Sequence, residues 1–313
     1  MKLSLPSRRA LLVCLSIWVV YLVFCQAMIG IRFEHVFFAL LFLACFIPTE
    51  LTRKFAMCMI PFVLFGISYD VMRLYPNYLV NEVDIQGIHD AELSLFGVTD
   101  GGVRMTLNEY FALHNSAVAD FFAGIFYLLW VPAPLAFCFY YFFKGDRAVF
   151  LHFTWAFLFI NLLGFVGYYV HPASPPWFFA QHGGSIDPSM LGEQLGSEAG
   201  LARFDALIGS PVFRGIYGRN ANVFAAVPSL HSTYCLCTFL YALKGHAHVV
   251  VTTLLGILSL GICWTAVYTS HHYLIDVLLG VSLCLGFVLL WEKVILRWGP
   301  VNRLEHRYVN YIK

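Results

Sequence analysis

Long uninterrupted runs of apolar residues alternate with short polar segments along this chain of 313 residues. A transmembrane helix needs about 20 consecutive, mostly apolar residues. Eight runs are candidates. Seven are long enough, and the remaining one, 35–48, is shorter and fits either a full span or a tilted or re-entrant segment. We count it as a span because the charges then divide consistently, and we expect an all-α integral membrane protein with about eight transmembrane helices. The seven longer runs cover residues 10–31, 55–73, 119–143, 149–170, 226–243, 247–268 and 273–293.

The basic residues gather on one side of this eight-span arrangement. Of the 19 lysines and arginines, 13 fall on the side that also holds both termini. The positive-inside rule assigns that side to the cytoplasm. The long connections 74–117 and 171–225 then face outward, toward a bacterial periplasm or a eukaryotic Golgi lumen. The 13 residues are Lys2, Arg8, Arg9, Arg53, Lys54, Lys144, Arg147, Lys244, Lys293, Arg297, Arg303, Arg307 and Lys313.

The composition excludes several classes of protein. Hydrophobic residues make up 60% of the chain and charged residues only 12%, whereas soluble domains carry about 25% charged residues. The mean hydropathy is +0.74. Soluble, disordered and coiled-coil proteins are therefore excluded, and the balance of 19 basic against 18 acidic residues argues against a nucleic-acid binder. All nine cysteines lie in apolar stretches, which predicts buried thiols and no disulfide framework.

Three ionisable residues stand where spans begin at the outward surface. His231 begins the sixth expected span, while His272 and Asp276 begin the eighth. Ionisable side chains at such positions are candidates for function. Because His272 and Asp276 are four residues apart, we expect them on one face of a helix, where the carboxylate accepts a hydrogen bond from one ring nitrogen. The other nitrogen is then left as a nucleophile, and His231 is expected to lie close to it.

The residues before His231 indicate a helix start that favours phosphate. Pro228 suits an opening turn because the N–H it lacks would be unpaired there, and Ser229 is a plausible N-cap. The free N–H groups and the positive end of the helix dipole attract anions. An isolated histidine at a membrane interface is more often structural than catalytic. A Pro-Ser-x-His segment followed about 40 residues later by His-x-x-x-Asp is a far less frequent coincidence.

At these residues the chain resembles the type 2 phosphatidic acid phosphatase superfamily. Its second motif, Pro-Ser-Gly-His, is matched by Pro228-Ser-Leu-His231, and the end of its third motif by His272 and Asp276. Thr265 and Ala266 stand where that third motif has Ser and Arg, so its phosphate-binding arginine is missing. The first motif, a Lys followed seven residues later by Arg-Pro, is absent too.

With these departures, the chain resembles one branch of the superfamily, the inositol phosphorylceramide synthases. The branch shares Pro-Ser-Leu-His-Ser at 228–232, the preceding Phe-Ala-Ala-Val at 224–227 and the Pro-Pro-Trp at 175–177. The resemblance implies a six-helix catalytic core and four regions. They are N-terminal transmembrane helices at 1–75, an outward interfacial segment at 76–117, a catalytic core at 118–295 that includes the outward loop 171–225, and a cytoplasmic tail at 296–313.

The resemblance implies a lipid phosphotransferase that moves phosphoinositol, or a similar headgroup, from a glycerophospholipid to a ceramide-like alcohol. His272 attacks phosphorus to form a phosphohistidine, Asp276 orients it, and His231 protonates the departing diacylglycerol and later deprotonates the acceptor. Such transfer needs no ion, so we expect no cofactor and no metal. The partners are then the two lipid substrates in the membrane, and the oligomeric state stays open.

The phosphate must meet positive charge or N–H donors elsewhere, because Ala266 is neutral. Arg219 is the first candidate, ahead of Arg214 and Arg203, although a loop arginine is just as often only solvated. The remaining candidates for substrate binding are Asn220, Ser229, Ser232, His271 and Trp177.

Two other functions stay open at this point. A lipid phosphatase would use the same triad with water as the acceptor, but a dianionic monoester needs more positive charge than these motifs supply. A proton-coupled transporter would use the same three residues as a relay, but they cluster at one surface and no inverted repeat is visible. The outward stretch Val83–Tyr110 carries several acids and His89 without a metal-binding spacing, and we expect it to lie partly on the membrane.

Overall fold

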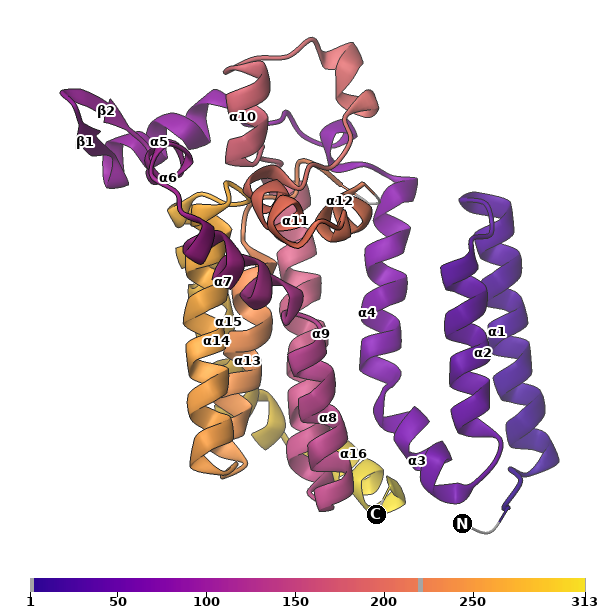
Figure 1. Ribbon diagram of the computed structural model, residues 1–313. Coiled ribbons are helices and arrows are strands. Elements are labelled where there is room, and N and C mark those ends of the chain that lie inside the picture. Colours follow the sequence, from indigo (N-terminus) through magenta and orange to yellow (C-terminus); the bar gives the residue numbers. More distant parts are fainter. Residues whose placement is uncertain (1–2, 219–221, 313) are drawn as a thin grey trace.

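A computed structural model describes residues 3–218 and 222–312. Long apolar helices run side by side in an upright bundle, and both ends of the chain lie at its lower end (Figure 1). We call that lower end the terminal end and the opposite one the loop end. Besides helices, the described residues form one two-stranded antiparallel sheet, in which β1 (Val98–Asp100) pairs with β2 (Val103–Met105) at the loop end.

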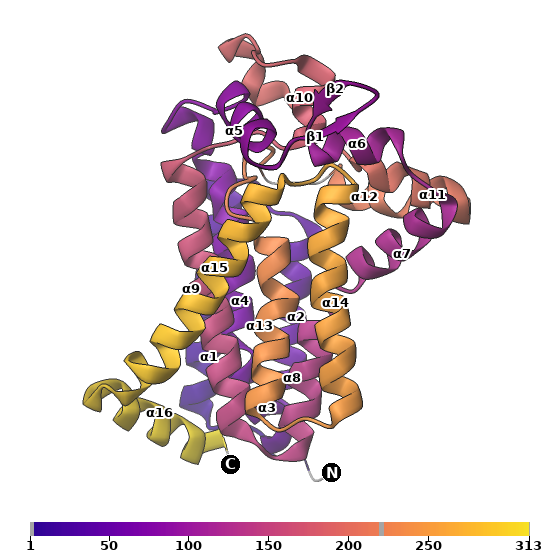
Figure 2. The ribbon, with the colours of Figure 1, turned by 90° about the vertical axis from the view of Figure 1, so that its left-hand side faces the viewer.

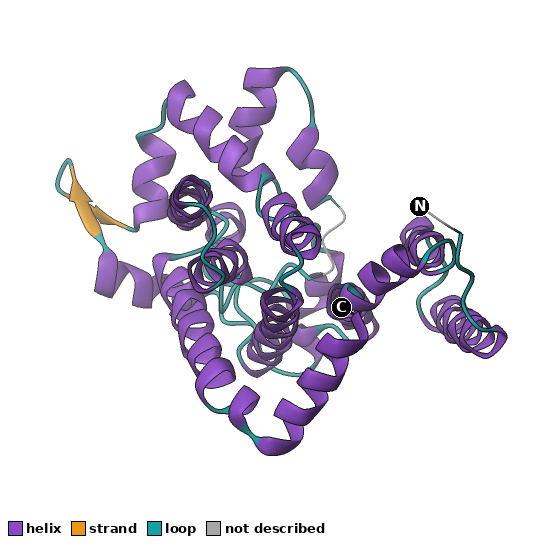
Figure 3. Cartoon of the chain, turned by 90° about the horizontal axis from the view of Figure 1, so that it is seen from below, coloured by secondary structure: helices purple, strands orange, loops and turns teal. Residues whose placement is uncertain are grey.

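The first four helices form two pairs, of which the first stands apart and the second is bent. The pair packs through its own aromatic contacts, with the rings of Trp18 and Phe42 5.5 Å apart, and stands at the edge of the bundle when seen from below (Figure 3). The next two helices meet at an angle of 46°. Pro61 fits the first turn of the second of these helices because a residue there needs no hydrogen-bonded N–H. The four helices are α1 (Arg8–Met28), α2 (Phe33–Phe46), α3 (Glu50–Cys58) and α4 (Ile60–Val71).

Six helices form the core, with α13 at its centre. The helix α13 packs against α14, α15, α9 and α8, an arrangement that Figure 2 shows from the side. Gly280 of α15 lets the start of α13 approach closely, because a Cβ there would collide with the backbone carbonyl of Ser229. The six helices are α7 (Ala117–Leu128), α8 (Pro132–Lys144), α9 (Arg147–Val170), α13 (Leu230–Lys244), α14 (Val249–Tyr268) and α15 (Leu274–Lys293).

The spans confirm an all-α membrane protein and correct some expected boundaries. Among the described residues, four helices are long and apolar enough to cross a membrane, or six if each of two bent pairs counts as one span. The run 119–143 is such a pair, with α7 and α8 bent by 46°. The helices α2 and α13 run along the bundle but have only 14 and 15 residues. Residues 226–229 are not helical, so α13 begins later than the hydrophobic run predicts.

Short helices cover the loop end of the bundle. Five short α-helices come from the two long connections that the sequence places outside the spans, and 3-10 turns link them (Figure 2). They bring segments far apart in the chain over the helix ends. The elements are η1 (Met72–Leu74), η2 (Asn77–Leu79), α5 (Gln86–Phe96), α6 (Leu107–Leu113), α10 (Pro176–His182), η3 (Pro188–Glu193), η4 (Ala199–Leu201), α11 (Ala202–Ile208) and α12 (Val212–Tyr217).

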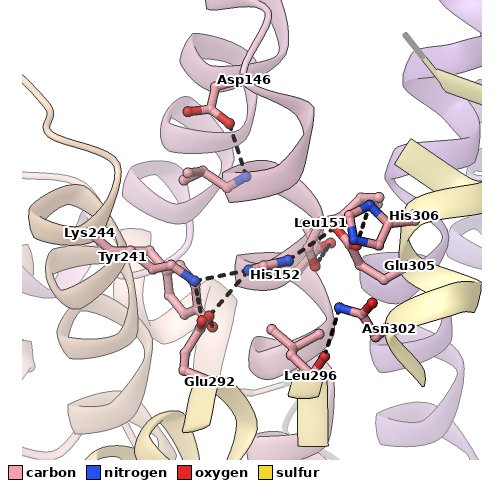
Figure 4. Close-up of polar contacts among 12 residues, drawn as sticks. Asp146, Leu151, His152, Tyr241, Lys244, Glu292, Leu296, Asn302, Glu305 and His306 are labelled. Carbon is pink, nitrogen blue, oxygen red and sulfur yellow. Dashed lines mark hydrogen bonds and ion pairs between the residues drawn. The ribbon is translucent and has the colours of Figure 1, made fainter. Parts of the chain in front are cut away.

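The expected tail is a helix that folds back under the terminal end. After η5 (Ile295–Arg297), α16 (Gly299–Ile312) packs against α9 and α3. Glu305 of α16 lies 3.2 Å from Nε2 of His152, whose other ring nitrogen contacts Lys244 and Glu292 (Figure 4). The hydroxyl of Tyr308 donates to the carbonyl of Met57 at 2.7 Å. These contacts tie the end of the chain to the bundle.

Candidate active site

Two histidines from separate helices meet at the loop end of the core. His231 lies in the first turn of α13, and His272 lies in the turn between α14 and α15. Nδ1 of His231 is 3.1 Å from Nε2 of His272. The turn bends sharply because the carbonyl of Ala266 accepts hydrogen bonds from the N–H groups of both His271 and His272, each at 3.0 Å. Ala266 therefore shapes the turn through its backbone. In the superfamily that the chain resembles, this position carries an arginine.

The hydrogen bonds decide which nitrogen of His272 carries its proton. Nδ1 of His272 lies 3.0 Å from the carbonyl oxygen of Ala226, and a carbonyl can only accept. Nδ1 therefore carries the hydrogen, and the neutral ring presents a lone pair at Nε2. That lone pair faces Nδ1 of His231, which must then donate to it. The pair thus holds a nucleophilic nitrogen next to a nitrogen that can hold a proton.

Asp276 takes a different position from the one expected. His272 lies before the first residue of α15, so the two side chains do not share a helical face. The carboxylate accepts from the N–H of Tyr273 at 2.9 Å, which makes it part of the cap of α15. Its Oδ2 is 3.4 Å from Nδ1 of His272. Asp276 is fully buried, and its carboxylate lies beside the ring. The hydrogen bond that orients the ring goes to the carbonyl of Ala226.

Burial also affects the protonation of His272. Only 4% of the residue is exposed, and this burial lowers the pKa of its imidazole to about 4, against the smaller opposing effect of the Ala226 carbonyl. The ring is therefore neutral at pH 7, as a nucleophile requires.

Aromatic rings enclose the histidine pair. The ring of Tyr127 is stacked on that of His231 with centroids 5.0 Å apart, and Trp130 meets it edge-on at 5.1 Å. Tyr217 lies 4.5 Å from the ring of His271. The sequence analysis did not single out these three residues, because aromatic residues are frequent in every span. Apolar walls of this kind exclude water and strengthen the electrostatic interactions inside.

A cavity of about 50 Å³ adjoins the two histidines. Its lining includes Trp177 of α10 and His271, as expected, together with Tyr217 and Asn222. Nδ1 of His271 lies 2.9 Å from the hydroxyl of Thr269. Among the described residues that line the cavity there is no lysine or arginine. Described residues also hold no group of three or more His, Cys, Asp or Glu arranged for a metal ion.

The other expected substrate-binding residues are placed elsewhere or are not described. Ser229 occupies the N-cap position of α13, but its hydroxyl makes no capping hydrogen bond. The hydroxyl of Ser232 donates to the carbonyl of Ser229 at 2.7 Å, so it serves the helix and does not line the cavity. Arg219 and Asn220 lie outside the described residues.

The two alternative arginines do not line the cavity either. Arg203 forms an ion pair with the nearly buried Asp120 at 2.7 Å and lies over the ring of Tyr268. Arg214 is exposed on α12. Neither arginine is positioned by the described contacts to hold a phosphate.

Three polar residues of the outward segment hold the site, a role the sequence analysis missed. Both carboxylate oxygens of the fully buried Glu92 accept N–H groups at the start of α15, each at 3.1 Å. Asn108 donates to the carbonyls of Val267 and His272 at 2.8 and 2.9 Å. Asn77 donates to the carbonyl of Phe224, just before the segment that holds His272. The segment therefore holds the site through hydrogen bonds, a role beyond the expected position partly on the membrane. Their sequence signal is weak: Asn77 and Glu92 each lie between apolar neighbours, whereas Asn108 is followed by Glu109.

Comparisons with known proteins identify the family of the chain. Residues 99–290 match the PAP2 superfamily. A phosphoinositol dihydroceramide synthase of Bacteroides thetaiotaomicron is 47% identical over 99% of this chain and 100% of its own length. The inositol phosphorylceramide synthase catalytic subunit of Schizosaccharomyces pombe is 25% identical over 85% of this chain and 61% of its own length.

A third relative extends the same branch. The inositol phosphorylceramide synthase of Candida albicans is 27% identical over 79% of this chain and 50% of its own length. No solved structure matches the chain. The chain is therefore an enzyme of the PAP2 superfamily, in the branch of the inositol phosphorylceramide synthases.

Proposed function

We propose that the enzyme transfers phosphoinositol from a phosphatidylinositol-type lipid to a ceramide-class alcohol through a phosphohistidine at His272, and releases diacylglycerol. The observation that carries this proposal is the pairing of Nε2 of His272 with Nδ1 of His231 at 3.1 Å. The substrate classes follow the names of the relatives, one of which covers the whole chain and is called a phosphoinositol dihydroceramide synthase.

In the first half-reaction the lone pair of Nε2 of His272 attacks the phosphorus of the donor. A nitrogen–phosphorus bond forms while the bond from phosphorus to the diacylglycerol oxygen breaks. Protonated His231 gives its proton to that oxygen, so diacylglycerol leaves as a neutral alcohol. The phosphorylated ring keeps its Nδ1 proton and becomes positively charged, and the nearby carboxylate of Asp276 stabilises that charge.

In the second half-reaction the acceptor replaces diacylglycerol. Neutral His231 takes the proton of the acceptor hydroxyl, and the resulting oxygen attacks phosphorus. The nitrogen–phosphorus bond then breaks, which restores the neutral His272 and the protonated His231. Because the two lipids use one site in turn, ping-pong kinetics are expected.

The equatorial phosphate oxygens need donors during both steps. The first turn of α13 offers unpaired N–H groups and the positive end of the helix dipole beside His231, and His271 and Asn222 line the same cavity. Arg219 stays our candidate for the cationic contact. A phosphodiester carries a single negative charge, so this set suits a diester headgroup better than the dianionic monoester of a phosphatase.

The membrane orientation belongs to the same proposal. The 13 basic residues that the sequence places on one side include those at both termini. We infer that the terminal end faces the cytoplasm and that the histidine pair lies at the outward surface. Extracellular and cytoplasmic labelling of single cysteines introduced into β1–β2 and α16 tests this orientation.

Product identification tests the function. Purified enzyme in detergent is incubated with a fluorescent ceramide and each member of a phospholipid panel, and the products are identified by mass. We expect a ceramide that carries phosphoinositol, together with an equal amount of diacylglycerol. The His272→Ala variant should form neither, whereas His114→Ala, which changes an exposed histidine just after α6, should retain activity. Free phosphate without a ceramide-linked product would replace the transferase by a phosphatase, and no lipid product at all would favour a transporter.

A further inference from the structure

A groove outside the catalytic core lies between the α1–α2 pair and α4. Its volume is about 540 Å³, within the range of about 300–1,000 Å³ that is typical of small-ligand sites. Trp18 and Tyr21 of α1, Phe38 of α2, and Phe62 and Gly66 of α4 line its apolar part. Figure 1 shows that α1 and α2 stand at the edge of the bundle, whereas α4 packs against α9 of the core, with the rings of Phe62 and Phe157 4.7 Å apart. The groove is also outside residues 99–290, which match the PAP2 superfamily.

A polar cluster closes the groove at the loop end. Asp70 is its centre, because its carboxylate accepts hydrogen bonds from Arg32 and, at 3.3 Å, from Nε of Arg73. Nε2 of the buried His35 lies 2.7 Å from the other oxygen of Asp70. Nδ1 of His35 accepts the backbone N–H of Arg32 at 3.2 Å, so Nε2 carries the hydrogen and the ring is neutral.

The charges of this cluster balance. Arg32 and Arg73 are cationic, while Asp70 and Glu34, which lines the same groove, are anionic. An anionic phosphodiester bound here would lie beside two carboxylates. A headgroup without charge that both donates and accepts hydrogen bonds matches the cluster better, and the apolar groove below it matches an alkyl chain. Ionisable residues at the end of a span are also costly to keep without a function.

We propose that this groove docks the acceptor, a neutral lipid of the ceramide class, with its amide and hydroxyl groups at the Asp70 cluster and an alkyl chain along α4. The proposal rests on the proposed function for the identity of the acceptor. It assigns the first two helices and α4 a substrate-binding role beside the core.

The groove is one helix away from the histidine pair. Tyr69, which lines the groove, lies next to Phe65, with ring centroids 6.5 Å apart. Phe65, on the neighbouring turn of α4, contacts the ring of Tyr234 with centroids 6.0 Å apart. Tyr234 in turn stacks on Trp130, which touches the ring of His231. The groove is therefore linked to the histidine pair by a chain of packed aromatic rings.

Crosslinking to the unmodified enzyme tests the site without relying on turnover. A photoreactive ceramide is crosslinked to the enzyme in nanodiscs made of phosphatidylethanolamine, and the labelled peptides are mapped by mass spectrometry. We expect labels on α1, α2 and α4 that excess unlabelled ceramide removes and that added phosphatidylinositol leaves in place. Labels that added phospholipid removes equally well would show a general lipid contact and overturn the proposal, as would the absence of labels from these helices.

Filling the groove tests its role in transfer. A Cβ at Gly66 meets no atom within 4 Å and Gly66 lines the groove, so we expect Gly66→Phe to place its ring there. We expect the KM for ceramide to rise about tenfold, the effect of losing burial of about two methylene groups, while the KM for the donor and kcat stay unchanged.

The matched control is Gly286→Phe on α15, where a Cβ also meets open space, and it should leave both KM values unchanged. A raised donor KM in Gly66→Phe would assign the groove to the phospholipid. Unchanged KM values in Gly66→Phe would remove the groove from substrate binding. Both of these results keep phosphoinositol transfer itself intact, so they are distinct from a failure of the proposed function, in which the unmodified enzyme forms no product.

Discussion

At the scale of single residues, the backbone carbonyl of Ala226 has the role usually given to a carboxylate. It holds Nδ1 of His272 at 3.0 Å, while Asp276 is 3.4 Å away and caps α15. Two functions of a triad acid are therefore separated in this site. The carbonyl sets the tautomer, and the carboxylate contributes charge. This separation predicts how the loss of the Asp276 charge affects kcat.

Replacement of Asp276 by Asn removes the charge but keeps an oxygen that can cap Tyr273. Because Ala226 still sets the tautomer, we expect kcat to fall by about 10–100-fold, in the range of losing one electrostatic contribution of about 1.4–2.7 kcal/mol. The measurement is the rate of diacylglycerol release in a single turnover. Asp187→Asn, at the exposed residue just before η3, is the control and should retain full rate. A loss as large as that of His272→Ala would instead make Asp276 the orienting group.

The lowered pKa of His272 predicts a pH dependence. Protonation of Nε2 removes the lone pair, so activity decreases as pH falls through the pKa of this residue. Since burial lowers that pKa to about 4, the acidic decrease in kcat/KM should lie well below pH 6.5, the value of an unperturbed histidine. A profile of kcat/KM against pH measures it, with samples returned to neutral pH to check that the enzyme stays folded. An acidic limb at pH 6.5 or above would contradict a buried neutral nucleophile.

At the scale of elements, the outward segment positions the turn that bears His272. The clearest contact is Glu92 of α5, which accepts the N–H groups of Leu274 and Ile275. Burial raises the pKa of this carboxyl, against the lowering effect of the two N–H donors. A remote side chain thus supplies the acceptor that helix α15 lacks at its start.

Replacement of Glu92 by Gln leaves one oxygen for two donors. We expect the protein to lose about 1–3 kcal/mol of stability, the cost of a buried donor without a partner, and kcat to fall more than either KM changes. Thermal unfolding in detergent and steady-state kinetics measure the two effects. Glu82→Gln, at an exposed position of the same segment, should change neither. A normal kcat in the Glu92 variant would limit this residue to stability.

At the scale of the whole molecule, the candidate active site and the contacts that hold α16 lie at opposite ends. The histidine pair lies at the loop end, whereas His152, Lys244, Glu292 and Glu305 join α9, α13, α15 and α16 at the terminal end (Figure 4). The amphipathic α16 depends on this cluster and on Tyr308 for its position. Its release should therefore not affect the reaction.

Replacement of Glu305 by Gln weakens the contact between α16 and His152. We expect faster hydrogen exchange of residues 299–312 and faster proteolysis there, with transfer activity within about twofold of the unmodified enzyme because a change of less than 0.5 kcal/mol is expected at a distant site. Arg307→Gln, on the exposed side of α16, should leave exchange unchanged. A large loss of activity in the Glu305 variant would reveal coupling between the two ends.

The sequence by itself determined the membrane class, the approximate position of the spans and the pairing of His231 with His272. Hydrophobic runs and ionisable residues at span ends are local signals, because the bilayer acts on every helix in the same way. Local signals also placed Trp177 and His271 near the site, where both line the cavity. For Ser232 they did not show that a hydroxyl in the first turn of a helix can bond to its own backbone, as it does here, instead of facing the cavity.

Only the tertiary structure decided how His272 is oriented and what holds its turn. Ala226, Asn108 and Glu92 act through a carbonyl, an amide and a carboxylate that come from segments 46, 164 and 182 residues away from their partners. No periodicity or spacing encodes such contacts, since they depend on where the loop end folds over the helices. The same holds for the groove beside α4, which exists only because the α1–α2 pair packs apart from the core.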